Sequence, residues 1–192
     1  MAKVDTKTRL MDVAEDQLRR KGADGVSYAD LSKGIGIRTA SIHYHFPAKS
    51  DLLSAVMARY SSEVLRHLED TWRLPYGAHR IAAFLDLYRE ALDEGSRLCL
   101  CVAYTVSQES LHPGTKAEIA RFREAVITWL MTSFDAGRKD GSIEGVGDLS
   151  SEAAAALALA EGAQIAARLR GSVHPFDQAT RGLRDRLTLT PF

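Results

Sequence analysis

The stretch that decides the fold is residues 34–53, which read GIGIRTASIHYHFPAKSDLL. Gly36 interrupts the preceding helical pattern, and a glycine there can adopt the positive φ that ends one helix before another begins. Pro47 ends the second helix, because the residue before a proline is pushed out of the α region. The stretch therefore predicts a turn followed by a helix of about two turns over residues 39–46, with Thr39 or Arg38 as its cap.

A helix this short is not stable alone. Ile42 and Phe46 lie four residues apart on one face, so they are expected to pack the helix against its neighbours. The small and polar residues between them remain on the other faces. This division between a packed face and an outward polar face is expected of a recognition helix, which enters the major groove of DNA.

Helices are predicted on both sides of this stretch. Residues 6–21 place apolar side chains at three- and four-residue steps, and Gly22 follows the last turn. Ser27 and Asp30 have the spacing of a capping box, so a second helix is predicted over residues 28–35. Residues 49–72 continue the apolar spacing and are too long for a small three-helix bundle alone.

Beyond a break at residues 74–77 the chain keeps its helical spacing, without strand-like alternation. Further helices are predicted over residues 78–94, 98–111, 115–139 and 150–170. The sequence therefore predicts an all-α fold in two domains. Residues 1–50 would form a three-helix helix-turn-helix DNA-binding domain, and residues 51–192 a larger helical domain for effector binding and dimerisation.

Charge is distributed unevenly along the 192 residues, although the formal net charge is zero. Residues 1–50 hold nine Lys/Arg against six Asp/Glu, a net +3, so the remainder, with 16 against 19, is −3. The N-terminal quarter is thus the part suited to a polyanion. No stretch approaches the ~18 apolar residues of a membrane span, and the start carries no secretory signal pattern. A cytoplasmic protein without a membrane partner is expected.

The N-terminal pattern resembles the TetR/AcrR (tetracycline-repressor) family of bacterial transcription regulators. The resemblance covers about residues 6–53: Gly22 and Gly25, SYADL at 27–31, GI at 36–37, IHYHF at 42–46 and KSDLL at 49–53. The combined spacing is more specific than any one segment. It implies a ligand-responsive transcriptional regulator, and we expect a repressor that binds a palindromic operator as a homodimer and is released by a small-molecule inducer.

The resemblance also implies roles for individual residues. Ser27 and Tyr28, at a helix start, would bind phosphate through hydroxyl and backbone N–H groups, and Lys49 would bind a second phosphate. The residues that would meet base edges or the DNA backbone are Arg38, Thr39, Ala40, Ser41, His43, Tyr44 and His45. His43 stands where the family commonly has tyrosine. His45 is equally well explained as a packed structural histidine.

Other functional classes have little support. Two histidines two residues apart on a helix diverge, and no Cys or Asp supplies further ligands, so no metal site is expected. The chain has no nucleophile and base arrangement, zinc-protease motif, P-loop or dinucleotide-binding glycine motif, so neither an enzyme nor a cofactor is predicted. A helical adaptor that does not bind DNA is the remaining alternative.

The effector site that the resemblance implies would use aromatic and polar residues on otherwise apolar helices. The candidates are Trp72, Phe84, Tyr88, Cys99, Tyr104, Gln108, Phe122, Trp129 and Gln164. Tyr104, Gln108 and Gln164 are favoured, because a polar tip inside a protein needs a partner. Cys99 or Cys101 could alternatively sense oxidants or electrophiles, but a small buried hydrophobe is the simpler interpretation.

Small side chains dominate residues 150–170, where the alanines include those at 153–156, 160, 163, 166 and 167. Small side chains allow helices to approach closely. The helices at residues 115–139 and 150–170 are therefore the predicted homodimer face, with ordinary intrachain core as the alternative.

Overall fold

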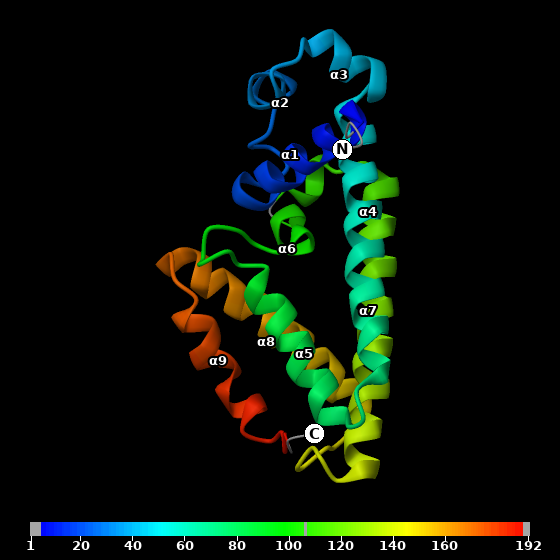
Figure 1. Cartoon of the computed structure of the whole chain (residues 1–192), viewed down its shortest axis with the longest axis vertical. Helices are drawn as coiled ribbons and strands as arrows, with labels where there is room; N and C mark the ends of the chain where they lie inside the picture. Colours follow the sequence, from blue (N-terminus) through cyan, green and yellow to red (C-terminus); the bar gives the residue numbers. More distant parts are fainter. Residues whose placement is uncertain (1–4, 106, 190–192) are drawn as a thin grey trace. The chain divides into compact units, whose positions relative to one another are not determined.

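The computed structural model describes residues 5–105 and 107–189. These residues form nine α-helices and two short 3₁₀ helices, with one isolated β-bridge between Ile143 and Leu187 and no strand (Figure 1). The predicted all-α class is confirmed. None of the described helices combines the length and apolar character that a bilayer span requires.

The chain divides into two compact units. Unit 1 comprises Met1–Ser62 and Leu100–Ala120, and unit 2 comprises Glu63–Cys99 and Arg121–Phe192. Unit 1 contains α1 (Thr6–Lys21), α2 (Tyr28–Ile35), α3 (Thr39–His45), the start of α4 (Lys49–Asp70), α6 (Leu100–Thr105), η2 (Gln108–Ser110) and the start of α7 (Pro113–Asp140). Unit 2 contains the rest of α4 and α7, with η1 (Thr71–Arg73), α5 (Gly77–Glu90), α8 (Leu149–Arg170) and α9 (His174–Arg184).

The α2–α3 turn forms as its sequence predicts. Gly36 adopts the left-handed conformation, with φ 74° and ψ 35°, and its N–H donates to the Ser32 carbonyl. Arg38 rather than Thr39 occupies the cap position of α3. The helix ends at His45, one residue early, because Phe46 before Pro47 takes an extended conformation, with φ −138°.

The core of unit 2 is built on aromatic side chains from α5, α7 and α9. The Phe84 ring lies 4.6 Å from that of Tyr88 and 6.2 Å from that of Trp129, measured between centroids. Phe134 and Phe176 are fully buried. Helices α8 and α9 pack side by side, as Figure 1 shows, and α9 lies in a part of the chain where no helix was predicted.

Gln164 holds two segments of this core together. Its side chain on α8 is fully buried and donates to the Tyr88 carbonyl over 2.6 Å. It also accepts from the N–H of Cys99 over 2.9 Å. The Gln164 side-chain amide thus forms hydrogen bonds with two buried backbone groups. Either group would destabilise the fold if it were buried without a partner.

The start of α5 lies against the end of α7. A Cβ at Gly77 would meet the backbone of Gly137 and would come within 2.6 Å of the Ser133 carbonyl, so only glycine fits. The Gly77 N–H donates to the Asp140 carboxylate over 2.8 Å, and the Ala78 N–H donates to the Ser142 hydroxyl over 3.0 Å. These contacts cap the first turn of α5 from another helix end.

Several predicted helix bounds are wrong. The predicted helix at 78–94 ends at Glu90, because Asp93, Glu94 and Gly95 all adopt positive φ. The predicted helix at 98–111 is only Leu100–Thr105 plus the 3₁₀ turn η2, and Leu111 is extended shortly before Pro113. The helix predicted over 49–72 ends at Asp70 and continues as η1. Apolar spacing alone did not reveal these tighter turns.

We expect Gln164→Leu to lower the free energy of unfolding by about 2–4 kcal/mol, because it leaves the Tyr88 carbonyl and the Cys99 N–H unpaired in the core. Urea denaturation followed by circular dichroism measures the change. Gln178→Leu, at an exposed α9 position, is the matched control and should change stability by less than about 0.5 kcal/mol. Equal effects of the two substitutions would contradict the role given to Gln164.

Candidate functional sites

The first candidate site is the surface formed by the starts of α2, α3 and α4. The Ser27 hydroxyl caps α2 by accepting from the Asp30 N–H over 3.2 Å and donates to the Asp30 carboxylate over 2.6 Å. This hydrogen bond lowers the pKa of Asp30. A phosphate at Ser27 would therefore bind mainly to the N–H groups of the first turn of α2, which have no carbonyl partner within the helix.

Tyr28 fixes the end of the short helix α3. Its hydroxyl donates to the Phe46 carbonyl over 2.9 Å, and burial followed by the nearby Asp51 carboxylate raises the pKa of Tyr28 to about 12. The ring of Tyr28 also meets the ring of His43 edge-on at 4.9 Å. The resemblance to the TetR/AcrR family implies that the Tyr28 hydroxyl binds phosphate. In the structure this hydroxyl is already hydrogen-bonded within the protein.

All ten residues predicted to contact DNA have solvent access in the structure. Five side chains on α3 and its cap are exposed, and the Tyr44 side chain is 83% exposed. The exposed residues are Ser27, Arg38, Thr39, Ala40, His43 and Tyr44, and the half-buried ones are Tyr28, Ser41, His45 and Lys49. By contrast Ile42 and Phe46 are buried, as their spacing predicts. Helix α3 therefore has one packed face and one accessible polar face.

Ion pairs join α1 to α4 within unit 1. The Arg59 guanidinium donates to the Asp12 carboxylate over 2.6 Å and to the Glu15 carboxylate over 2.9 Å. The Arg19 guanidinium lies 5.7 Å from the centre of the Tyr60 ring. The Tyr104 hydroxyl of α6 donates to the Leu53 carbonyl of α4 over 3.1 Å. Arg59 has no local sequence signal for this role, because its partners lie 44 and 47 residues away.

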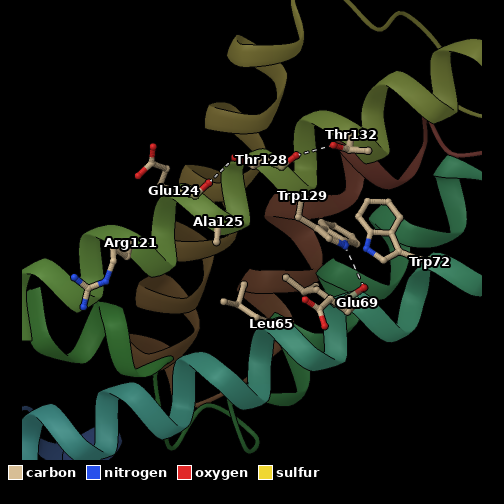
Figure 2. Close-up of a pocket in the computed structure, with 10 residues that line it drawn as sticks. Leu65, Glu69, Trp72, Arg121, Glu124, Ala125, Thr128, Trp129 and Thr132 are labelled. Atoms are coloured by element: carbon tan, nitrogen blue, oxygen red, sulfur yellow. Dashed lines mark hydrogen bonds between the residues drawn. The ribbon is translucent and has the colours of Figure 1, made fainter.

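The second candidate site is a groove of about 510 Å³ in unit 2, between α4 with η1 on one side and α7 on the other. Figure 2 shows Leu65 facing Ala125, and the two tryptophans beside each other at one end. The Trp72 and Trp129 ring centres are 5.7 Å apart. The groove is lined by Leu65, Leu68, Glu69, Trp72, Arg121, Glu124, Ala125, Thr128, Trp129 and Thr132.

Residues 10–56 match the model of the family described as bacterial regulatory proteins, tetR family. This match contains α2, the turn and α3, which form the accessible surface described above. The chain belongs to the TetR family. No curated protein matches it significantly in sequence.

Solved structures of TetR-family regulators share this fold. A regulator from Agrobacterium tumefaciens is 25% identical, with a TM-score of 0.88 over 95% of this chain and 97% of that one. A regulator from Legionella pneumophila is 26% identical, with a TM-score of 0.84 over 98% and 100%. A structure from Saccharomonospora viridis, described as a putative transcriptional regulator in complex with choline, is 19% identical, with a TM-score of 0.76 over 98% and 100%.

Membership of the TetR family determines the functional class of this chain. TetR-family regulators are non-enzymatic DNA-binding proteins, so this chain is a transcriptional regulator with a helix-turn-helix and not an enzyme. Within the described residues no group of three or more His, Cys, Asp or Glu side chains could hold a metal ion.

The residues predicted to bind an effector do not all line the groove. Only Trp72 and Trp129 line the groove. Phe84, Tyr88, Cys99, Phe122 and Gln164 are buried in unit 2, while Tyr104 is buried and Gln108 exposed in unit 1. Tyr104 and Gln164, which were favoured because of their polar tips, use those tips to bind backbone groups.

The cysteines are both reduced and buried, with Cys99 3% and Cys101 1% exposed. A buried thiol reacts slowly with oxidants and electrophiles, because the thiolate forms poorly in an apolar environment and access is limited. Both residues fit the interpretation as small hydrophobic core residues.

The hydrogen bond from Tyr28 to Phe46 generates a prediction for this TetR-family head. Tyr28→Phe removes about 1 kcal/mol of local stability, so amide hydrogen exchange across residues 39–46 should become about fivefold faster. Tyr44→Phe is the matched control, because the Tyr44 ring is exposed, and exchange should not change. If both substitutions leave exchange unchanged, Tyr28 does not hold the end of α3.

Proposed function

We propose that this TetR-family protein is a ligand-responsive repressor that binds a palindromic operator as a homodimer and is released by a small molecule. The observation that carries the proposal is the accessible polar face of α3, held by the buried Ile42 and Phe46 beside the start of α2. A helix with one packed and one open face can enter a major groove without losing its own support. We further propose that residues 1–50 bind DNA and that residues 51–192 bind the effector and dimerise.

Each accessible residue of α3 has a chemical role in this proposal. Arg38, at the cap, reaches guanine or phosphate, since its guanidinium can bind either through two hydrogen bonds. Thr39, Ala40 and Ser41 are small enough to approach base edges, and Tyr44 contacts the DNA backbone. Lys49 at the start of α4 binds a second phosphate. The remaining contacts come from Ser27, Tyr28, His43 and His45.

The homodimer face is best assigned to α8. Six of its exposed residues follow alternating four- and three-residue steps, which place them on one stripe: Ser151, Ala155, Ala158, Gly162, Ile165 and Leu169. Ile165 and Leu169 are large apolar side chains that are 55% and 91% exposed. The later part of α7, which was predicted to share the face, instead exposes Arg121, Glu124, Thr128 and Thr132. A small, apolar stripe supports close pairing with a second copy, and a polar face does not.

The effector part of the proposal rests on α4, which contributes residues to both units. A ligand that binds one arrangement of this helix better than another shifts the population towards it, and a coupling of about 1–3 kcal/mol suffices for regulation. The Saccharomonospora viridis structure supports the proposal that this architecture accommodates a small molecule. Thiol sensing is the weaker candidate, because both cysteines are buried.

The test of DNA binding is selection of duplexes from a random pool, followed by titration of the best palindrome in increasing salt. We expect affinity to fall steeply with salt while sequence preference is retained. Arg38→Ala should weaken operator binding roughly tenfold and lower the salt slope by about one. Lys139→Ala, at an exposed position of unit 2, is the control and should bind like the wild type. If the pool yields no preferred sequence, the repressor proposal is wrong, and the alternative of a helical adaptor that does not bind DNA is supported instead.

The test of the dimer is Ala158→Arg, which introduces a charged side chain into the proposed α8 stripe. Light scattering after size exclusion should change from a dimer mass to a monomer mass, because burying an unpaired charge is costly. Glu90→Arg, on the exposed surface of α5, should leave the dimer unchanged. Persistence of the dimer in a folded Ala158→Arg protein would remove α8 from the interface.

A further inference from the structure

We propose that the groove between α4 and α7 binds a small organic cation with an aromatic or other apolar body. This inference deepens the proposed function, because it names the chemical class of the effector. Only the expected effect of ligand binding on operator affinity rests on that proposed function. The site itself is argued from the side chains that line the groove in unit 2.

The floor of the groove is apolar and aromatic. Leu65 and Ala125 lie along it, with Trp72 and Trp129 at one end (Figure 2), and Leu68 also lines the groove. Trp129 is nearly buried and packs on Phe84, so it is a fixed wall. Trp72 is 39% exposed and offers accessible ring surface. A volume of about 510 Å³ is in the range of pockets that hold small organic molecules.

The hydrogen-bonding groups of the groove are mostly acceptors. The Thr128 hydroxyl donates to the Glu124 carbonyl over 3.0 Å, and the Thr132 hydroxyl donates to the Thr128 carbonyl over 3.0 Å. Because each hydroxyl hydrogen is used, each oxygen offers only lone pairs to a ligand. The Trp129 N–H is likewise used, donating to the Leu68 carbonyl over 3.1 Å. A ligand that fits this groove must therefore supply most of the donors.

Charge points to the same class of ligand. Two carboxylates, Glu69 and Glu124, and one guanidinium, Arg121, line the groove, so its formal charge is −1. Figure 2 shows Glu69 on the α4 wall and Glu124 on the α7 wall, and both residues are exposed. Arg121 already takes part in an interaction within the protein. The two carboxylates are therefore the groups available to a cation.

One face of the Trp72 ring already carries a cation of the protein itself. The Arg80 guanidinium lies over it, 4.9 Å from the ring centre, while donating to the Leu74 carbonyl over 3.1 Å. The electron-rich face of an indole binds cations, and tryptophan does so better than the other aromatic side chains. Aromatic surface, excess acceptors and two carboxylates together select a flat or compact cation, such as an amidinium or ammonium with an apolar body.

Three molecules of nearly the same shape test the charge: benzamidinium, neutral benzamide and anionic benzoate. The readout is tryptophan fluorescence of the full-length protein, because Trp72 and Trp129 are the only two tryptophans and both line the groove. We expect benzamidinium to bind with a dissociation constant of about 1 mM, a typical value for a small fragment. Benzamide should bind at least about tenfold more weakly, and benzoate should not bind. Equal binding of all three would overturn the proposal.

Substitutions identify the groups responsible. Glu69→Gln/Glu124→Gln should weaken benzamidinium binding roughly tenfold and abolish the preference over benzamide, whereas Glu90→Gln, an exposed acid outside the groove, should have no effect. Trp72→Leu should also weaken binding, while Tyr76→Leu, at a similarly exposed aromatic, should not. Wild-type affinity in the double glutamine variant would overturn the assignment.

Operator binding, measured in parallel, separates the two proposals. If the cation binds in the groove but operator affinity is unchanged by it, the site stands and the inducer part of the proposed function fails. If the wild-type protein binds its operator but shows no preference for benzamidinium, the ligand class fails and the DNA-binding function stands. Release from the operator by benzamidinium, absent in the double glutamine variant, supports both.

Discussion

The candidate surface at the starts of α2, α3 and α4 depends on neighbours that hold α3, a helix too short to be stable alone. Helix α3 has seven residues, and such a helix forms only when neighbours fix it. Buried Ile42 and Phe46 supply the packing, and the Tyr28 hydroxyl holds the Phe46 carbonyl at its end. Because these contacts all lie on one side, the opposite side is left open. The accessible face of α3 thus follows from the same contacts that make the helix possible.

Much of this head could be predicted from the sequence because its determinants are local. The Gly36 turn, the stop at Pro47 and the Ser27 cap each act within a few residues, and all three occur in the structure. The limits of α5 and α6 were not predictable in this way. Three consecutive residues with positive φ end the turn after α5, and two of them, Asp93 and Glu94, are not the glycines that usually mark such a conformation.

The candidate sites show the same division. Exposure of the α3 residues followed from helical spacing, but the use of the Tyr28, Tyr104 and Gln164 polar groups did not, because their partners are backbone groups 18 to 76 residues away. Two tryptophans of the groove, Trp72 and Trp129, were predicted, but its two carboxylates were missed for the same reason. Glu69 and Glu124 are ordinary surface residues in the sequence, and they form one site only when α4 and α7 pack together. Long-range pairing of two helix faces leaves no local pattern.

The backbone contact between Gly77 and Gly137 has a consequence for how this protein can diversify. With no space for even one methyl group at Gly77, a larger residue there would have to push α5 away from α7 and break the caps from Asp140 and Ser142. Related sequences are therefore expected to keep glycine at this crossing while varying freely at Gly182, where nothing lies within 4 Å. The substitutions that this chain tolerates are thus limited at a point where two main chains meet, far along the sequence from the short helix α3.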